Sequence, residues 1–407
     1  MSDPRTYATA LAENSLGLAE GSLGPHALPE ELVAAVAAAV RGQPVRGDAA
    51  PVLEQQMLSL LASVRESSLS EDGFFVRKAR WPGAAPFAVC LTHDVDNISR
   101  TRGHLWKTRS RFGLGDLIGG LLGLTSPYDN VDLIASRERS HGFHSSFYYL
   151  TSNYPLARVK PASDRVRASG SEVGLHGDFG THDSEEKMDE AVARFSGALG
   201  FRPAGLREHY LKFDFARSWE VFERSGFDYD TTLGTNDRLG FKLGLATPFH
   251  PPDASWSPMK LLEIPLILMD TTLWGYLKRA EEEGFHDALG MMKAVEDVEG
   301  LFTLLWHQEA VRMRGGRVYW SLLDEIGRRG CFVGSGAEIS SWWRARSLPL
   351  LKKGKLIRVE GQAPRGLVLR LSLAEGRTPR VSSGTLERDG GDFLVAPQGP
   401  DFSLEVE

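Results

Sequence analysis

Residues 87–97 read FAVCLTHDVDN, an apolar run that ends in a histidine and two carboxylates. An apolar run of this kind is typical of a buried strand, and buried strands do not ordinarily end in negative charge. Asp94 and Asp96 are separated by one residue, so they can share one face of a strand or, where the chain turns, serve different parts of one site. One of them could instead cap the following helix. The stretch therefore predicts either a helix cap or a reactive site at a strand end.

Short apolar runs alternate with helical stretches between residues 76 and 345. Strands that alternate with helices indicate βαβ units around a parallel sheet. In a (β/α) barrel the active site lies where the strands end, on the carboxyl face. Several of the runs end in a polar or charged residue. We therefore predict an α/β fold, a (β/α) barrel, whose strand ends carry Asp94, His176, Asp270 and His307.

The character of the sequence changes on both sides of this region. Residues 1–75 read as helices and loops, whereas residues 346–407 hold short apolar runs divided by Gly, Pro and Asp turns. Such runs predict a small all-β unit, which could bind sugar, bind the main domain or only cover it. We therefore divide the chain into an N-terminal helical segment (1–75), a barrel (76–345) and a small β-rich accessory domain (346–407).

The bulk composition argues against several classes of protein. A net charge of −6 gives no sign of the basic surface that binds nucleic acid. The only two cysteines, Cys90 and Cys331, provide neither a disulfide framework nor a metal-finger spacing. The N-terminal stretch has no secretory pattern, and no apolar run reaches the ~20 residues that cross a bilayer. We expect a cytoplasmic protein without a transmembrane segment and without a nucleic-acid partner.

Two histidines follow the predicted strand in EVGLHGDFGTHDS (172–184). A catalytic zinc site commonly uses three nitrogen or oxygen ligands and keeps a position open for water. Asp96, His176 and His182 would supply such a set, although a lone histidine is more often structural. Arg207, in LREHYLKFD (206–214), could hold a catalytic carboxylate or form an ordinary surface ion pair. His307 follows a buried run and could act as a general acid if a carboxylate lies beside it.

These stretches, in this order, resemble the five motifs of the polysaccharide deacetylases, the family of the NodB-homology domain and of carbohydrate esterase family four. The resemblance covers about residues 80–345. Each motif is weak alone, but five in sequence are fairly specific. The matching positions are Thr92, Asp94 and Asp96 in the first motif, His176 and Gly177 in the second, Arg207 and Tyr210 in the third, Asp270 and Trp274 in the fourth, and His307 in the fifth.

The resemblance implies a distorted (β/α) barrel that uses a divalent metal, often zinc, to hydrolyse an N-acyl group on an amino sugar. Such chemistry needs a Lewis acid to polarise the amide carbonyl, a base that takes a proton from water, and an acid that protonates the leaving nitrogen. The implied roles are general base for Asp94, metal ligand for Asp96 and His176, orientation of Asp94 for Arg207, oxyanion stabilisation for the Tyr210 backbone N–H, and general acid for His307, tuned by Asp270.

The chain departs from the family pattern at two positions. The family's second histidine lies four residues after the first, where this chain has Gly180, and His182 lies six residues after His176. We predict His182 as the third metal ligand, with Asp178 as the fallback. The proline of the third motif is replaced by His209, a histidine that could contact metal or substrate.

The connection between the first two predicted strands is long and unusual in composition (SRTRGHLWKTRSRFGLGDLIGGLLGLTSPYDN, 99–130). Basic residues and Trp106 precede an apolar, Gly-rich stretch, a pattern that can lie in a membrane interface. We therefore name peripheral membrane contact through residues 100–126 as one reading. The alternatives are an active-site lid packed on the barrel and a buried helix pair. Trp106, Trp274 and Trp306 could stack on a sugar, or could belong to the core.

The function that we predict is metal-dependent deacetylation, with Zn²⁺ as the expected divalent ion and an amino sugar as the substrate. The substrate would be a cytoplasmic lipid- or nucleotide-linked intermediate or another polysaccharide precursor. Two alternatives stay open. One is an amidohydrolase that acts on a non-sugar amide or formamide; the other is a metal-less carbohydrate-binding or scaffold protein, which the glycine at position 180 keeps in contention.

Overall fold

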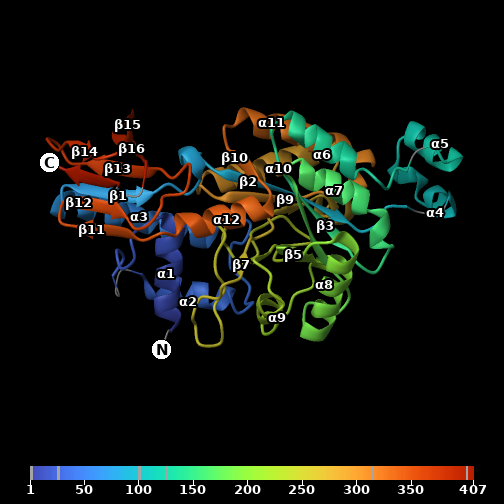
Figure 1. The fold of residues 1–407 in the computed structure, drawn as a ribbon, viewed down its shortest axis with the longest axis horizontal. Helices are drawn as coiled ribbons and strands as arrows, with labels where there is room; N and C mark the ends of the chain where they lie inside the picture. Colours follow the sequence, from blue (N-terminus) through green and yellow to red (C-terminus); the bar gives the residue numbers. More distant parts are fainter. Residues whose placement is uncertain (1–2, 25–27, 100–101, 125, 314, 400–401) are drawn as a thin grey trace.

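The computed structural model describes residues 3–24, 28–99, 102–124, 126–313, 315–399 and 402–407 of the chain. The molecule is elongated (Figure 1). A β-rich unit lies at one end, the barrel occupies the middle, and the short helices α4 (Arg102–Lys107) and α5 (Leu114–Leu122) project at the other end.

The centre of the fold is a parallel sheet of nine strands. Eight of them follow the path β7–β6–β5–β4–β3–β2–β9–β8, and β10 pairs with the first half of β2. The predicted α/β barrel is therefore confirmed. The strands are β2 (Ala88–Val95), β3 (Ser146–Leu150), β4 (Glu172–Gly177), β5 (Gly205–Glu208), β6 (Tyr229–Asp230), β7 (Leu262–Glu263), β8 (Leu268–Met269), β9 (Leu301–Leu305) and β10 (Phe332–Gly334).

The sheet is curled because its two edge strands follow one another in the sequence. Strands β7 and β8 stand at opposite ends of the path, yet only residues 264–267 join them. That link spans at most about 18 Å, whereas a flat sheet of this size would separate its edges by about 34 Å. The apolar stretch LLEIPLILM (261–269) thus holds two short strands. Pro265 lies between them, and proline cannot donate to a strand ladder.

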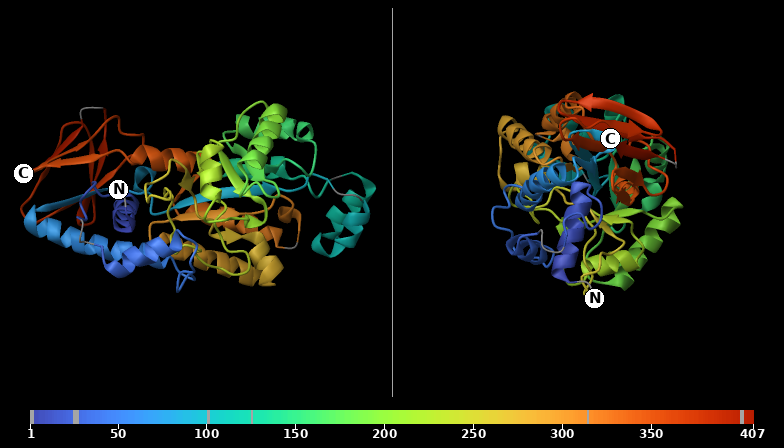
Figure 2. Two further views of the ribbon diagram at one scale, coloured as in Figure 1. Left: turned by 90° about the horizontal axis from the view of Figure 1, so that it is seen from below. Right: turned by 90° about the vertical axis from the view of Figure 1, so that its left-hand side faces the viewer.

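Helices cover the outside of the curled sheet (Figures 1 and 2). The helix α8 shows why the sequence forms them: Ser184 caps its start, two glutamates fill its first turn, and Gly200 ends it with a left-handed φ of 87°. Its apolar residues recur at helical spacing and are buried. The helices of this layer are α6 (Val131–Ser140), α7 (Lys160–Ala168), α8 (Glu185–Leu199), α9 (Ser218–Arg224), α10 (Glu281–Glu296), α11 (Gly316–Arg328) and α12 (Gly336–Arg346).

The N-terminal helices α1 (Pro4–Leu16), α2 (Glu30–Ala39) and α3 (Val52–Glu71) pack on the barrel and share its hydrophobic core. A fully buried ion pair, Glu54 with Arg80 at 2.8 Å, lies beneath them. Both ions also have hydrogen bonds to Ser15, as a buried pair requires. Within the described ranges of the chain, no helix is long and apolar enough to span a bilayer.

The β-rich unit is a sandwich of two antiparallel sheets with orders β1–β13–β16–β15 and β11–β12–β17–β14. Its first strand comes from the N-terminal part of the chain, so the boundary expected after residue 75 falls inside β1. The sequence pattern did not predict that a strand from before the barrel would pair with β13 of the C-terminal unit. The strands are β1 (Phe74–Lys78), β11 (Leu350–Lys353), β12 (Leu356–Val359), β13 (Leu369–Leu373), β14 (Pro379–Val381), β15 (Gly384–Asp389), β16 (Asp392–Pro397) and β17 (Ser403–Val406).

One ion pair ties this sandwich to the barrel. Arg77, on β1, donates two hydrogen bonds of 2.9 and 2.7 Å to the carboxylate of Glu299, which precedes β9. Burial alone would raise the pKa of Glu299, but the hydrogen bonds and charge of Arg77 outweigh burial and lower it to about 2. Because the Arg77 side chain is only 9% exposed, solvent screens this pair less than an ordinary surface pair.

We predict that Glu299→Gln lowers the free energy of unfolding at pH 7 by about 1–2 kcal/mol, after allowance for solvent screening. Because the folded pKa lies below the ordinary 4.5, the ionised carboxylate stabilises the fold above that value. This contribution is lost as the pH falls toward 2. Denaturant unfolding at pH 7 and at acidic pH measures both effects.

The matched control is Asp132→Asn, which removes the carboxylate of an exposed pair with Arg165. Exposed pairs contribute little, so this variant should unfold like the wild type within about 0.5 kcal/mol. Equal losses in both variants, or a Glu299→Gln deficit that persists at acidic pH, would contradict the assigned role of the pair.

Candidate metal centre and active site

The carboxyl ends of the parallel strands bring the predicted site residues to one edge of the sheet. Asp94 lies at the end of β2, His176 near the end of β4 and Arg207 on β5, while Asp270 and His307 follow β8 and β9. Parallel strands have their carboxyl ends on the same side, so residues distant in sequence meet there. Except for Arg207, these residues line a cavity of about 290 Å³.

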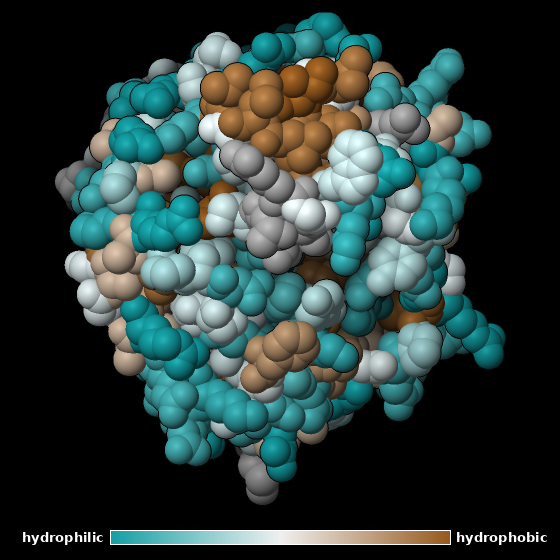
Figure 3. Space-filling view, turned by 90° about the vertical axis from the view of Figure 1, so that its right-hand side faces the viewer, coloured by the Kyte–Doolittle hydropathy of each residue, from teal (hydrophilic) through white to brown (hydrophobic). Residues whose placement is uncertain are grey.

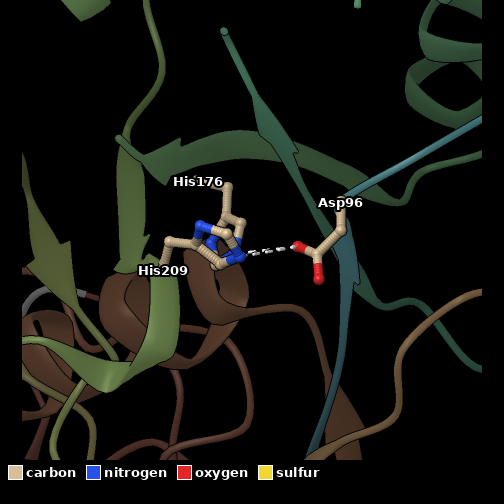
Figure 4. A group of neighbouring side chains, drawn as sticks. All are labelled: Asp96, His176 and His209. Carbon is tan, nitrogen blue, oxygen red and sulfur yellow. Dashed lines mark ion pairs between the residues drawn. The ribbon is translucent and has the colours of Figure 1, made fainter. Parts of the chain in front are cut away.

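Three side chains in this cavity form a group that could hold a metal ion: Asp96, His176 and His209 (Figure 4). One ligand atom from each lies within 4.8 Å of the other two. The Nε2 atoms of His176 and His209 lie 3.2 and 3.8 Å from Oδ1 of Asp96. Two imidazoles and one carboxylate match the donor set of a catalytic zinc site with an open position.

The orientation of His176 makes a cation the natural occupant. Its Nδ1 lies 2.8 Å from the backbone carbonyl of Arg207, so Nδ1 carries the proton and donates it. The Nε2 lone pair then faces Oδ1 of Asp96, and neither atom has a hydrogen-bond partner although both are buried. Two facing acceptors repel unless a positive charge lies between them. A metal-bound histidine commonly has this arrangement, with its second nitrogen bonded to a carbonyl.

The charges of the three side chains support the same reading. Burial lowers the pKa of His176, but the nearby Asp94 and Asp96 outweigh burial and raise it, so the local field favours a proton or a metal ion at Nε2. Burial and the neighbouring His176 lower the pKa of His209, which keeps its lone pair free. Burial alone would raise the pKa of Asp96, but the surrounding imidazoles hold it well below its ordinary range.

His182, predicted as the third ligand, does not belong to this group. Its backbone carbonyl accepts a hydrogen bond from Ser218, on α9, and its Nε2 lies 3.8 Å from Asp183. The loop turns at Gly180, where φ is +80°, a left-handed value that a histidine would adopt only at a cost. The expected position of His182 is therefore corrected, and His209 supplies the second imidazole.

Asp178, the alternative ligand, is also outside the metal group and is hydrogen-bonded to other protein groups. Its carboxylate accepts hydrogen bonds from Thr151, Ser152 and Arg194. These bonds anchor the loop after β4 to the loop after β3. A carboxylate with so many protein donors is satisfied without a metal ion. The structure therefore gives Asp178 a role in holding the loop.

Asp94 lies beside the metal group and contacts a buried arginine. Arg207 donates from Nη1 to Oδ1 of Asp94 at 3.2 Å and to Thr92 at 2.8 Å. The rest of the guanidinium is bonded to the backbone and side chain of Thr231, so the arginine cannot turn away. The second oxygen, Oδ2, lies 3.7 Å from Nε2 of His176. Arg207 is thus a buried positioning group and not a surface ion pair.

His307 stands across the cavity with its own carboxylate. Its Nδ1 lies 2.7 Å from Oδ1 of Asp270, and its Nε2 lies 3.9 Å from Oδ2 of Asp96. Burial lowers the pKa of His307, but the charge and hydrogen bond of Asp270 outweigh burial and raise it well above the ordinary value. Asp270 thus favours the protonated imidazole, the form that a general acid needs before it acts.

The rim of the cavity is strained and aromatic. Tyr210 and Leu211 have φ values of 60° and 52°, an uncommon left-handed conformation for side chains of this size. This turn exposes the ring of Tyr210 and stacks it on His209 with 3.9 Å between ring centres. Tyr276 also lines the cavity and is exposed. Two aromatic rings thus flank the opening.

None of the three tryptophans considered as sugar-stacking residues lines the cavity. Trp306 is fully buried, and Trp274 packs against it with 6.1 Å between ring centres. Trp274 also fills the space above two glycines, Gly284 and Gly315, where a side chain would collide with its ring. Trp106 is exposed on α4 and does not line the cavity. The first two tryptophans belong to the core.

Further residues line the cavity that sequence patterns did not predict, among them Arg111, Asn236, Tyr276 and Glu309. Burial raises the pKa of Glu309 to about 7, against the opposing charge of His307. None of the four belongs to a motif with defined spacing. His209 was visible in the sequence only as an unexpected histidine in the third motif, and nothing in its spacing distinguished it from His182 as a ligand.

Comparison with known proteins was made by sequence and by structure. No protein-family model and no curated protein matches the sequence. Among solved structures, a Mycobacterium smegmatis protein assigned as a polysaccharide deacetylase is similar, with a TM-score of 0.50 and 17% identity over 67% of this chain and 96% of that one. The chain has the polysaccharide deacetylase fold. The resemblance seen in the five motifs is therefore confirmed as a likeness of fold.

Other solved structures align less closely. The Puue allantoinase has a TM-score of 0.48 and 16% identity, with 66% of this chain and 93% of that chain covered. The peptidoglycan deacetylase PdaC from Bacillus subtilis has a TM-score of 0.37 and 11% identity, with 64% and 93% covered. At such identities the similarity establishes the architecture, and the chemistry has to come from the residues of this chain.

We predict that the purified protein binds one divalent ion and that His176→Ala lowers its affinity for that ion by about 100-fold or more, because the deepest imidazole donor is removed. His209→Ala should weaken binding by a similar factor. Elemental analysis after dialysis against a chelator, followed by titration with Zn²⁺, measures the affinities.

His182→Ala is the control for these two variants, since His182 lies in the same loop region but outside the metal group. It should retain the metal content of the wild type. If His182→Ala lost the ion while His209→Ala kept it, the ligand assignment from the structure would be wrong.

Proposed function

We propose that this protein is a metal-dependent hydrolase that removes an N-acyl group, acetyl in the simplest case, from an amino sugar. The observation that carries the proposal is the pair of facing acceptors, Oδ1 of Asp96 and Nε2 of His176, with the Asp94 carboxylate and the His307 imidazole on either side. A cation site flanked by a base and an acid is the arrangement that amide hydrolysis needs.

The residues of the chain divide the reaction between them. When bound by Asp96, His176 and His209, a divalent ion would polarise the carbonyl and lower the pKa of water. Asp94 has its Oδ1 fixed by Arg207, so its Oδ2 is free to take the proton from the attacking water.

On the other side of the cavity, His307 protonates the nitrogen that leaves. Asp270 holds Nδ1 of His307, which turns Nε2 toward the cavity and stabilises the imidazolium. The Tyr210 backbone N–H is proposed to hold the developing oxyanion, because the left-handed turn at Tyr210 places this residue in the cavity wall.

The aromatic rim supports a sugar as the substrate rather than a small amide. One face of a pyranose ring carries mainly C–H groups, and Tyr210 and Tyr276 offer exposed rings beside the cavity. Asn236, also in the wall, can bond a hydroxyl or an amide. Zn²⁺ as the ion, a lipid- or nucleotide-linked precursor as the substrate, and a cytoplasmic location are the finer parts of this proposal.

Acetate release tests the proposal directly. We expect the Zn²⁺-loaded protein to release acetate from N-acetylhexosamines, either free, nucleotide-linked or lipid-linked, at rates at least about 100-fold above those with acetamide, formamide or allantoin. The difference is expected because remote sugar contacts position the amide. Faster turnover of the small amides would favour the non-sugar alternative, and no turnover with retained sugar binding would favour the scaffold alternative.

Asp94→Asn should lower kcat by about 100-fold to 10,000-fold with little change in metal content, because the base is lost while the ligands remain. Asp183→Asn is the matched control, an exposed carboxylate outside the metal group, and should keep the wild-type kcat. Single-turnover acetate release under saturating substrate measures both. A wild-type rate in Asp94→Asn would remove Asp94 from the role of base.

The pH dependence of kcat should depend on Asp270. A general acid must be protonated, so kcat falls as the pH rises through the pKa of His307. Burial lowers this pKa and Asp270 raises it; Asp270→Asn should therefore move the alkaline limb of the profile to lower pH by about one unit or more. A bound cation lowers the pKa in both proteins, so the comparison isolates Asp270.

Thr271→Val serves as the control for this comparison. Thr271 lies against Asp270 and His307 with hydroxyl distances of 3.4 and 3.5 Å but carries no charge. Its alkaline limb should coincide with that of the wild type. An unshifted limb in Asp270→Asn would show that His307 is not the acid seen in the profile.

A further inference from the structure

Helices α4 and α5 form a hairpin, residues 102–124, at the end of the molecule opposite the β sandwich (Figure 1). One face of the hairpin is attached to the barrel. Leu105, Phe112 and Tyr128 form a small cluster with Met313, and Arg312 pairs with Asp116 at 2.8 Å. The hairpin therefore has a fixed inner side, and its orientation on the barrel is defined.

The outer face of α5 is apolar and exposed. Leu114, Ile118 and Leu122 recur at four-residue spacing, which places them on one side of the helix, and Leu124 follows. They are 74%, 48%, 63% and 77% exposed. Figure 3 views this end of the molecule and shows hydrophobic side chains gathered in one continuous patch. Contiguous exposed patches of this kind on a soluble domain commonly mark binding surfaces.

Cations accompany this apolar face. Lys107, Arg109 and Arg111 are exposed, and among the described residues no carboxylate pairs with them. Arg109 lies over the ring of Trp106 at 4.8 Å, and that ring is 55% exposed. The single acid of the hairpin, Asp116, is neutralised by Arg312. A local excess of positive charge thus stands out against the net charge of −6 of the whole chain.

We propose that the hairpin binds the surface of a membrane that contains anionic lipid. An apolar helix face with adjacent Lys, Arg and Trp side chains has the composition of an interfacial helix, in which leucines enter the acyl boundary and cations meet the headgroups. A second copy of this chain fits less well, since pairing through the same face brings the cations of both copies together. This inference concerns binding and stands apart from the proposed hydrolysis.

The position of the hairpin gives the binding a consequence for the active site. Arg111 of the hairpin and Met313, which contacts the hairpin, both line the cavity of the metal group. Strand β2 runs toward the same end of the molecule (Figure 1). The cavity therefore borders the hairpin that carries the docking face, and we infer that a bound membrane would bring headgroups near it. Together with the proposed function, on which this step rests, the substrate would be a lipid-linked amino sugar.

Vesicle flotation with the full chain tests the membrane proposal. We expect the wild type to float with phosphatidylcholine vesicles that contain about 30% phosphatidylglycerol. Binding should be about tenfold or more weaker to phosphatidylcholine alone, and weaker again in about 1 M salt, which screens the cations. Leu114→Ser/Leu122→Ser should lower binding by about tenfold or more, and Lys107→Gln/Arg109→Gln should remove the preference for anionic lipid.

The matched control is Leu351→Ser/Leu386→Ser, which changes two exposed leucines on the sandwich and should leave flotation unchanged. Metal content and thermal unfolding confirm that each variant is folded. Equal flotation of the Leu114→Ser/Leu122→Ser variant, or no flotation of the wild type, would overturn the proposal. Self-association that depends on Leu114 and Leu122 without flotation would also overturn it and would assign the face to a second copy. Acetate release from a soluble sugar, measured in parallel, reports separately on the hydrolase.

Discussion

The site depends on one constraint: two buried acceptors, Oδ1 of Asp96 and Nε2 of His176, face one another at 3.2 Å. The carbonyl of Arg207 accepts a hydrogen bond from Nδ1 of His176, so in the neutral imidazole the lone pair of Nε2 faces Asp96. A buried polar atom without a partner is unfavourable, and a positive charge between the two is the simplest remedy. The proposed roles of Asp94 as base, Arg207 as positioning group and His307 as acid follow from their positions around this pair of acceptors.

The curled sheet is what makes such a contact possible. Asp96 directly follows β2 and His176 lies on β4, two strands that are far apart in sequence and separated in space by β3 alone. The short link between β7 and β8 forces the sheet to bend, and the bend turns the strand ends toward a common cavity. Asp270 and His307 follow β8 and β9, which pair directly, so these two residues meet without the bend. A flat sheet would instead leave Asp270 far along the edge from the residues of β4 and β5.

The two ends of the molecule have contrasting surfaces. The sandwich includes β1 as an edge strand, although β1 precedes the barrel in the sequence, and it is joined to the barrel by the ion pair of Arg77 and Glu299. The opposite end carries an apolar helix face and exposed cations, of which Arg111 lines the cavity. The N-terminal helices bridge the two, since Arg65 of α3 bonds to the sandwich while the start of α3 bonds to a barrel loop. This brace holds the sandwich and the barrel in one arrangement.

Sequence patterns alone determined the local features. The alternation of apolar runs and helical stretches predicted the βαβ architecture, and the polar residues after apolar runs predicted the strand ends where Asp94, His176, Asp270 and His307 lie. They failed where distant contacts decide: the split at Pro265, the partner of β1, and the choice of His209 over His182. Spacing along the chain made the two histidines nearly equivalent. Only the folded structure separates them. Thr181 donates a hydrogen bond to Glu208, the backbone carbonyl of His182 accepts one from Ser218, and the strained turn at Tyr210 leaves His209 beside Asp96. The position of a ligand depends on the backbone path between elements, and the sequence does not place those elements relative to one another.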